Sequence, residues 1–250
     1  MKGLNGKRVI VTGGANGIGK AIVERFLAEG AIVFAIDKDA TGLKKLSHGN
    51  HADRFSMMRV NIAAPDVSAQ LKRAKFLSNV DILVNNAGVD LPYDHLTNRG
   101  NWEKIFAVNI AGTRTVTEAV LDSMQSRGRG GSIIFITSVH TAFAFNGGGA
   151  YDASKHALVG YMRSLALAFG PAGIRSNAIA PGAIYPTNIT RGIPMKEVVR
   201  IGKTIPTPRF GTPHEIAGPV AWLASDDAAY VNGAEIRVDG GLAIKAPFEE

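Results

Sequence analysis

The sequence contains no cysteine among its 250 residues. This absence excludes a disulfide-stabilised scaffold, a zinc site with thiolate ligands and a thiol nucleophile. No stretch of about 18 consecutive apolar residues occurs, so no membrane span is predicted. Residues 1–7 lack the apolar core and cleavage site of a signal peptide, and we expect a cytoplasmic protein. The histidines and acidic residues show no metal-ligand spacing, so no metal is predicted.

Positively charged residues are only moderately in excess over negatively charged ones. The chain carries 28 Lys and Arg against 21 Asp and Glu, which gives a formal net charge of +7. The cations are scattered, and their densest cluster, Arg127-Gly128-Arg129, has no aromatic residue beside it that could stack on bases. We therefore interpret the basic charge as a solvated surface and predict no nucleic-acid partner.

Apolar runs alternate with amphipathic stretches along the whole chain. Hydrophobic residues make up 46% of the sequence and charged residues 20%, which is typical of a globular domain. The predicted strands cover residues 8–12, 31–36, 55–60, 81–84, 132–137, 175–179 and 234–238. The predicted helices cover residues 18–29, 66–77, 102–125, 151–169 and 213–224. This alternation predicts one α/β domain over residues 1–250, a doubly wound Rossmann-type domain with a parallel seven-stranded sheet and helices on both faces.

Residues 181–212 interrupt this alternation with five prolines. A long proline-interrupted segment inside a compact domain is often a binding loop or a lid. We therefore predict a substrate loop at about residues 181–212.

The predicted helix over residues 151–169 is apolar almost all the way round. A helix of this kind is buried on two sides. The sheet accounts for one side, and a neighbouring subunit is the predicted partner for the other. We expect the two longest helices, over residues 102–125 and 151–169, to pack against their copies in an oligomer.

A glycine-rich turn follows the first predicted strand. Gly13, Gly17 and Gly19 form the pattern G-x-x-x-G-x-G directly before a helix, with Asn16 and Ile18 between them. Glycine permits a positive φ and a close approach of the main chain to a phosphate, and the helix N-terminus offers N–H groups to an anion. Plain turn chemistry also produces such patterns, but the strand–turn–helix context favours a pyrophosphate site.

Asp37 ends the second predicted strand, at the distance from the glycines where dinucleotide-binding domains place a carboxylate. It can accept hydrogen bonds from both hydroxyls of an adenosine ribose, and it repels a 2′-phosphate. Lys38 can relieve part of that repulsion, whereas Asn16 supplies no cation. A helix cap or a surface acid is the structural alternative. The pattern predicts NAD rather than NADP.

Ser138, Tyr151 and Lys155 form a candidate catalytic set. Tyr151 and Lys155 are four residues apart and so share one face of a helix, while Ser138 follows the fifth predicted strand. A neighbouring ammonium favours the phenolate and lowers a tyrosine pKa from about 10, which makes the tyrosine a usable general acid–base. A serine hydroxyl can hold a substrate oxygen. Taken separately, each motif also has a purely structural explanation. Tyr151 and Lys155 could be an ordinary pair on a helix, and Ser138 could be a cap or turn residue at the end of a strand.

Together these motifs resemble the short-chain dehydrogenase/reductase family over residues 7–242. The matching segments are Thr12-Gly13 with Gly17 and Gly19, Asn85-Asn86-Ala87-Gly88, Asn109, Ser138, Tyr151 with Lys155, Pro181-Gly182 and Asp239-Gly240-Gly241. The resemblance implies that Tyr151 is the acid–base and that Lys155 lowers its pKa and binds the nicotinamide ribose. It further implies that Ser138 positions the substrate oxygen and that Asn109 holds a water of a proton relay.

The resemblance also implies the contacts to the cofactor and a homotetrameric assembly. The implied cofactor-binding residues are Gly13, Asn16, Gly17, Ile18, Gly19, Asp37, Asn61, Ile62, Asn86, Ala87, Gly88, Tyr151, Lys155, Pro181, Gly182, Ile184 and Thr187. Two positions depart from the family pattern. Asn61 stands where members often carry Asp, although its amide carbonyl still offers adenine an acceptor. Thr187 comes one place later than expected, after Pro186.

The predicted function is hydride transfer between NAD and a secondary alcohol or ketone. Ser138-Val139-His140 and Pro181-Gly182-Ala183-Ile184 look like segments of sugar dehydrogenases, which favours a sugar, polyol or similar small hydroxylated substrate. Arg209-Phe210-Gly211 is shared with 3-oxoacyl thioester reductases, which are the alternative. A non-catalytic dinucleotide-binding protein is the other alternative, but it has no need of the full catalytic set. His140 is open to two readings, contact with a polar substrate and a plain loop histidine.

Overall fold

All seven predicted apolar runs form strands of one sheet. The computed structural model describes residues 1–46, 51, 53–91, 100–144 and 147–244. The strands are β1 (Arg8–Thr12), β2 (Ile32–Asp37), β3 (Phe55–Arg59), β4 (Ile82–Asn85), β5 (Gly131–Ile136), β6 (Ile174–Pro181) and β7 (Glu235–Val238). They are parallel and lie in the order β3-β2-β1-β4-β5-β6-β7. The predicted seven-stranded, doubly wound sheet is confirmed.

The central strands are buried on both faces, as their unbroken apolar sequences require. In β1, Val9 and Val11 join one core cluster, while Ile10 between them joins the other. Successive side chains of a strand point to opposite faces, so these two clusters lie on the two sides of the sheet.

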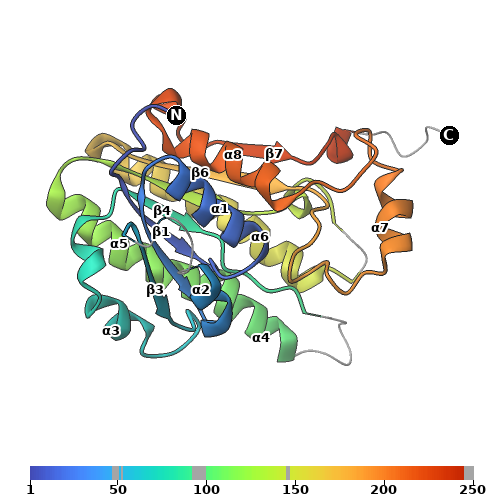
Figure 1. The fold of residues 1–250 in the computed structure, drawn as a ribbon, viewed down its shortest axis with the longest axis horizontal. Coiled ribbons are helices and arrows are strands. Elements are labelled where there is room, and N and C mark those ends of the chain that lie inside the picture. Colours follow the sequence, from blue (N-terminus) through green and yellow to red (C-terminus); the bar gives the residue numbers. More distant parts are fainter. Residues whose placement is uncertain (47–50, 52, 92–99, 145–146, 245–250) are drawn as a thin grey trace.

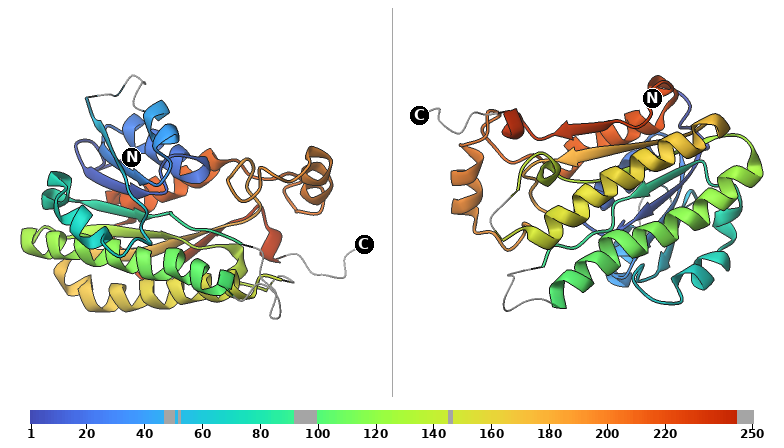
Figure 2. Two further views of the ribbon diagram at one scale, coloured as in Figure 1. Left: turned by 90° about the horizontal axis from the view of Figure 1, so that it is seen from below. Right: turned by 180° about the vertical axis from the view of Figure 1, so that it is seen from behind.

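Helices cover both faces of the sheet. They are α1 (Gly17–Ala28), α2 (Ala40–Leu46), α3 (Val67–Lys72), α4 (Gly100–Phe106), α5 (Thr113–Arg127), α6 (Gly149–Phe169), α7 (Met195–Gly202) and α8 (Pro213–Ala224). In Figure 1, α1 and α8 lie side by side across the front of the sheet. The long helices α5 and α6 cover the opposite face, as the right-hand view of Figure 2 shows. None of the described helices is long and apolar enough to cross a membrane.

Two predicted helices are divided in the structure. The segment predicted as one helix over 102–125 consists of α4, a π-helical turn (Ala107–Gly112) and α5. The segment predicted over 66–77 consists of α3 and a 3-10 turn (Lys75–Asn79). A π turn inside a helix is rare and is frequently found at a functional site; this one carries the buried Asn109.

The proline-rich segment 181–212 is more ordered than the predicted loop. Its first residue, Pro181, still belongs to β6, and it contains the amphipathic helix α7. Val198 of α7 packs with Ile205 and Phe210 in a small apolar cluster of its own. The predicted substrate loop thus contains a helix, which this local burial stabilises between the prolines, and its role toward a substrate stays a prediction.

Candidate active site

A cavity of about 940 Å³ lies at the C-terminal ends of the strands. The residues that follow β1, β2, β4 and β5 line it, and so does the last residue of β6. The chain order reverses between β1 and β4, which is where ligands bind in open parallel sheets. All the predicted cofactor-binding residues, together with Ser138, line this one cavity. Asn109 is the exception among the predicted site residues, since it is not part of the lining.

The glycine turn leaves no room for side chains. Gly13 has φ +66°, and a Cβ on it would lie 2.9 Å from Cα of Ala87. A Cβ on Gly19 would lie 2.0 Å from the carbonyl oxygen of Gly13. Asn86 fastens the turn, since its Nδ2 donates to the carbonyls of Thr12 and Gly13, both at 3.0 Å. The bare main chain at the start of α1 fits a pyrophosphate.

The carboxylate of Asp37 is fixed by main-chain N–H groups. Its Oδ2 accepts from Ala15 N at 3.0 Å and its Oδ1 from Asp39 N at 2.9 Å. The capping alternative for Asp37 is wrong, because Asp39 holds the first turn of α2 through Gly42 N at 3.0 Å. This hydrogen bond, with a second from Asn16, lowers the pKa of Asp39. Asp37 is therefore left to line the cavity, at the place that fits an adenosine ribose.

Ser138 and Tyr151 meet at the end of β5. Ser138 begins a 3-10 turn (Val139–Thr141), and Tyr151 lies in the first turn of α6. Their side chains are hydrogen-bonded, and both are buried. Burial raises the pKa of Tyr151, the Ser138 hydrogen bond lowers it, and the charges of Asp90 and Asp152 raise it. The net direction is upward, so the neutral phenol is the stable form.

Lys155 lies one helical turn from Tyr151, but its effect on the phenol differs from the prediction. Nζ donates to the carbonyl of Ile136 at 2.9 Å and lies 5.3 Å from the centroid of the Tyr151 ring. Burial lowers the pKa of Lys155 to about 8. The expected lowering of the Tyr151 pKa by Lys155 is not found: burial of the phenol is the largest influence on that pKa, and it acts upward.

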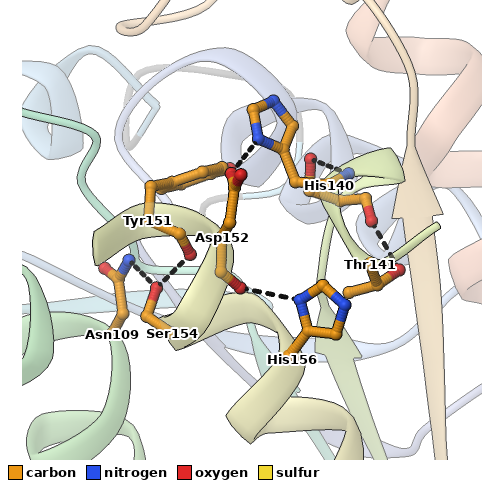
Figure 3. Close-up of polar contacts among 8 residues, drawn as sticks. Asn109, His140, Thr141, Tyr151, Asp152, Ser154 and His156 are labelled. Carbon is orange, nitrogen blue, oxygen red and sulfur yellow. Dashed lines mark hydrogen bonds and ion pairs between the residues drawn. The ribbon is translucent and has the colours of Figure 1, made fainter. Parts of the chain in front are cut away.

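Asn109 ties the end of β4 to the start of α6. Its Oδ1 accepts from Val89 N at 2.8 Å, and its Nδ2 donates to Val89 O and to Ser154 Oγ, both at 3.0 Å. Ser154 Oγ in turn donates to the carbonyl of Tyr151 at 2.7 Å (Figure 3). Asn109 thus fixes the backbone that presents Tyr151, and its role toward a water stays a prediction.

Thr187 lies against the glycine turn despite its shifted position in the sequence. A Cβ on Gly17 would lie 3.3 Å from Cα of Thr187. The Thr187 hydroxyl is paired with Thr190 Oγ1 at 2.9 Å, and Thr190 donates to the carbonyl of Ile184 at 2.8 Å. These bonds fold the start of segment 181–212 over the cavity.

Sequence reasoning missed two acidic residues beside the candidate catalytic set. Asp152 directly follows Tyr151, is buried, and its carboxylate binds Nδ1 of His140 (Figure 3). Asp90 lies two residues after Gly88 and lines the cavity. The available signal was Asp152 itself, the one acidic residue of its helix, directly after the tyrosine. Among the described residues, no group of three or more His, Asp and Glu is placed to hold a metal ion.

Comparison with known proteins agrees with this geometry. Residues 13–243 match a family model described as enoyl-(acyl carrier protein) reductase. The chain is 37% identical to 3beta-hydroxysteroid dehydrogenase 2 of Eggerthella lenta, with 95% of each chain covered. It is 36% identical to D-threitol dehydrogenase of Mycolicibacterium smegmatis, over 97% of this chain and 95% of the relative. It is 37% identical to the 3-oxoacyl-(acyl-carrier-protein) reductase FabG of Escherichia coli, over 95% and 97%.

A solved structure shows the same architecture. The ligand-free aldohexose dehydrogenase of Thermoplasma acidophilum superimposes with a TM-score of 0.88 at 33% identity, over 99% of this chain and 98% of the other. The matches extend over nearly the whole chain in sequence and in structure, so they cover both the cavity and the sheet beneath it. The chain therefore belongs to the short-chain dehydrogenase/reductase family, whose enzymes are oxidoreductases that act on CH–OH groups and ketones.

Proposed function

We propose that the protein transfers a hydride between NAD(H) and a secondary alcohol or ketone, with a sugar, polyol or similar small hydroxylated compound as substrate. One observation carries this proposal: Ser138, Tyr151 and Lys155 line the same cavity as the glycine turn and Asp37. The threitol and aldohexose dehydrogenases among the similar proteins support the substrate class.

The proposed proton chemistry lies at the hydroxyl of Tyr151. In ketone reduction the neutral phenol gives its proton to the carbonyl oxygen, and in alcohol oxidation the phenolate takes the hydroxyl proton. Ser138, already hydrogen-bonded to Tyr151, holds the same substrate oxygen. The ammonium of Lys155 binds the ribose next to the ring. A bound nicotinamide dinucleotide supplies or accepts the hydride. Because burial favours the neutral phenol, oxidation is expected to rise with pH and reduction to fall.

Members of this family use nicotinamide dinucleotides, and we propose NAD for this chain. The carboxylate of Asp37 is held in place by two main-chain N–H groups and offers its remaining lone pairs to the ribose hydroxyls. Asp37→Ala is expected to narrow the ratio of kcat/KM for NAD over NADP by about ten- to a hundredfold, the worth of one hydrogen bond to a charged group. A wild-type preference for NADP would refute this assignment.

We propose a homotetramer, with α6 as part of its interface. The exposed residues of α6 include the small residues Ala157, Gly160 and Ala168 and the apolar Leu167, which is 82% exposed, beside the polar His156, Arg163 and Ser164. Gly160 has no atom within 4 Å of where a Cβ would lie. Light scattering of the wild type and of Leu167→Glu tests the assembly, and a monomeric wild type at micromolar concentration would contradict it. A cytoplasmic location and the absence of a nucleic-acid partner stay predictions.

A 3-oxoacyl thioester reductase is the second candidate, favoured by the similarity to FabG. A panel of sugars, polyols and simple secondary alcohols with NAD, set against acetoacetyl thioesters with NADPH, distinguishes the two. We expect the highest kcat/KM within the polyol and sugar group with NAD. Efficient thioester reduction with no alcohol oxidation would establish the alternative. Dinucleotide binding without turnover of any substrate would establish a non-catalytic binding protein.

A further inference from the structure

A second cavity lies at the β3 edge of the sheet, apart from the candidate active site. Its volume is about 470 Å³, which is enough for a small organic molecule. The residues that line it come from β1, β2, β3 and the segment after α3, and no described residue lines both cavities. We call it the edge cavity, and the lining residues that carry the argument are Arg8, Phe34, Ser56, Met58, Arg73 and Phe76.

The wall of the edge cavity is aromatic. The rings of Phe34 and Phe76 are stacked, with their centroids 4.9 Å apart at 17°. Ser56 is the register partner of Phe34 on β3, and Met58 points to the same face of the sheet two residues later. A methionine side chain adapts its shape and makes favourable contacts with aromatic rings. The wall is therefore suited to a flat aromatic ligand.

Arg8 brings a positive charge to this wall. Its Cζ lies 4.2 Å from the centroid of the Phe76 ring, and its Nη2 donates to the Phe76 carbonyl at 3.3 Å. Its Nε is buried and has no hydrogen-bond partner. Asp81 accepts from the main-chain N–H of Arg8 at 2.8 Å, but its carboxylate pairs with the guanidinium of Arg127. The contact with Phe76 explains how Arg8 packs, and it leaves the charge without a counterion among the described residues.

Arg73 adds a second positive charge at the edge cavity. It directly follows α3, is exposed, and lines the cavity. The arginines that form ion pairs in the described part of the chain are others. The described lining contains no acidic residue. A planar guanidinium binds a carboxylate through two parallel hydrogen bonds, so a carboxylate complements this pair of arginines.

We propose that the edge cavity binds a small aromatic carboxylate, with the anionic group at the two arginines and the ring against the aromatic wall. The carboxylate supplies the counterion that Arg8 lacks, and the ring removes apolar surface of the wall from water. The site does not depend on the proposed function, because it shares no described residue with the cofactor cavity.

Calorimetric titration of the wild type with 2-naphthoate tests the site. The matched neutral ligand is 2-naphthamide, which has the same ring without the charge, and acetate has the charge without the ring. We expect 2-naphthoate to bind and 2-naphthamide to bind at least about tenfold more weakly, the loss of one hydrogen bond to a charged group. Acetate should show no binding at the same concentrations. Saturation with NAD should leave the Kd of 2-naphthoate unchanged.

Four variants locate the ligand. Arg8→Met removes the charge and keeps an apolar stem, so the preference for 2-naphthoate over 2-naphthamide should fall by at least about tenfold. Arg73→Gln should act in the same direction but less, because its side chain is exposed. Ser56→Trp fills the cavity from the edge strand and should abolish binding of both ligands. Lys72→Gln is the matched control, since Lys72 precedes Arg73, carries the same charge and does not line the cavity; it should leave both affinities unchanged.

The outcomes that overturn the site are distinct. The site is wrong if 2-naphthoate does not bind at millimolar concentration, or if it binds no more tightly than 2-naphthamide. It is also wrong if NAD displaces 2-naphthoate, because the ligand then lies in the cofactor cavity, or if the arginine variants keep the wild-type preference. If thermal unfolding shows that Arg8→Met does not fold, Arg73→Gln and Ser56→Trp decide, since both replace exposed residues.

Discussion

The two sides of the cavity are built differently. On the cofactor side, main chain packs directly on main chain: Gly13 N donates to Ile36 O at 2.7 Å, and Gly19 approaches the Gly13 carbonyl so closely that no side chain fits. On the substrate side, residues of the 3-10 turn after β5 and of the segment 181–212 line the cavity, with His140 and Ile193 among them.

This difference explains why cofactor binding can be predicted from the sequence and the substrate cannot. A close main-chain approach admits only glycine, so the cofactor side leaves a fixed pattern in the chain. A side chain that faces substrate can be replaced without disturbing the fold. Enzymes that share the cofactor side can therefore act on steroids, threitol or aldohexoses, as the names of the similar proteins indicate.

The largest expected effect on stability sets Gly19 of the glycine turn against Gly192 of the segment 181–212. In Gly19→Ala the new Cβ would lie 2.0 Å from the Gly13 carbonyl oxygen, whereas Gly192 has nothing within 4 Å of that position. Overpacking at Gly19 should cost about 3 kcal/mol or more and lower Tm by about 10 °C. Gly192→Ala should change the free energy of unfolding by less than about 0.5 kcal/mol. Equal Tm values for the two variants, measured by calorimetry, would contradict the claim that only Gly19 is closely packed.

Lys155 lies in the same cavity, and its burial predicts a pH-dependent decrease in the free energy of unfolding. Its ammonium titrates at 10.5 when unperturbed and at about 8 in the folded protein. Between these values the unfolded chain binds more protons, so the free energy of unfolding rises with pH from about 8 to 10.5, and below 8 the penalty is complete. Lys155→Met should thus stabilise the cofactor-free protein at pH 7 by about 3 kcal/mol, since one pKa unit is about 1.4 kcal/mol.

Urea unfolding of Lys155→Met and of the wild type at several pH values measures this gain in the free energy of unfolding. The gain should be complete below pH 8 and absent above pH 10.5. The variant should have lost alcohol oxidation at every pH. A variant less stable than the wild type at pH 7 would contradict the claim that burial of the Lys155 ammonium destabilises the folded protein.

The smallest effect belongs to the start of α8, where the segment 181–212 returns to the cofactor side. Glu215 accepts from Thr212 N at 2.8 Å and pairs with Arg209. The Arg209 hydrogen bond, followed by that of Thr212, lowers the pKa of Glu215 to about 2. Because the pair is largely exposed, Glu215→Ala should cost only about 1 kcal/mol at pH 7.

The pH dependence of that cost has a definite sign. The contribution of Glu215 is fully present above its unperturbed pKa of 4.5 and disappears as the pH falls toward 2. Thermal unfolding of the variant and the wild type at pH 7 and pH 3 should therefore show a difference that shrinks at the lower pH. A difference that grows on acidification would contradict the assignment.

The strands were predictable and two helices were not. Every predicted strand lies within two residues of its observed ends. For the central strands the reason is that buried parallel strands are continuous apolar runs, whereas β3 and β7 are only partly buried. The short helix α2 holds only seven residues, including Gly42, and depends on the cap from Asp39 rather than on periodicity. The helix α7 depends on tertiary packing of Val198, which the prolines around it conceal.

The residues that line the cavity of the candidate site were predictable, and its electrostatics were not. The spacing of the glycines and of Tyr151 with Lys155 is a local property of the chain. The upward pKa shift of Tyr151 depends on burial and on Asp90, more than 60 residues away in sequence, so it required the fold. The pair of His140 with Asp152 also joins two elements that no local pattern connects.

Replacement of Tyr151 tests the central claim most directly. Tyr151→Phe removes the hydroxyl that carries the proton and leaves the glycine turn and Asp37 in place, so NAD should still bind with nearly wild-type affinity. The rate of hydride transfer, followed by stopped-flow absorbance of NADH with a diol, should fall by roughly 10² to 10⁴. A variant that keeps more than about a tenth of the wild-type rate would contradict the account, because no positioned general acid–base is worth so little.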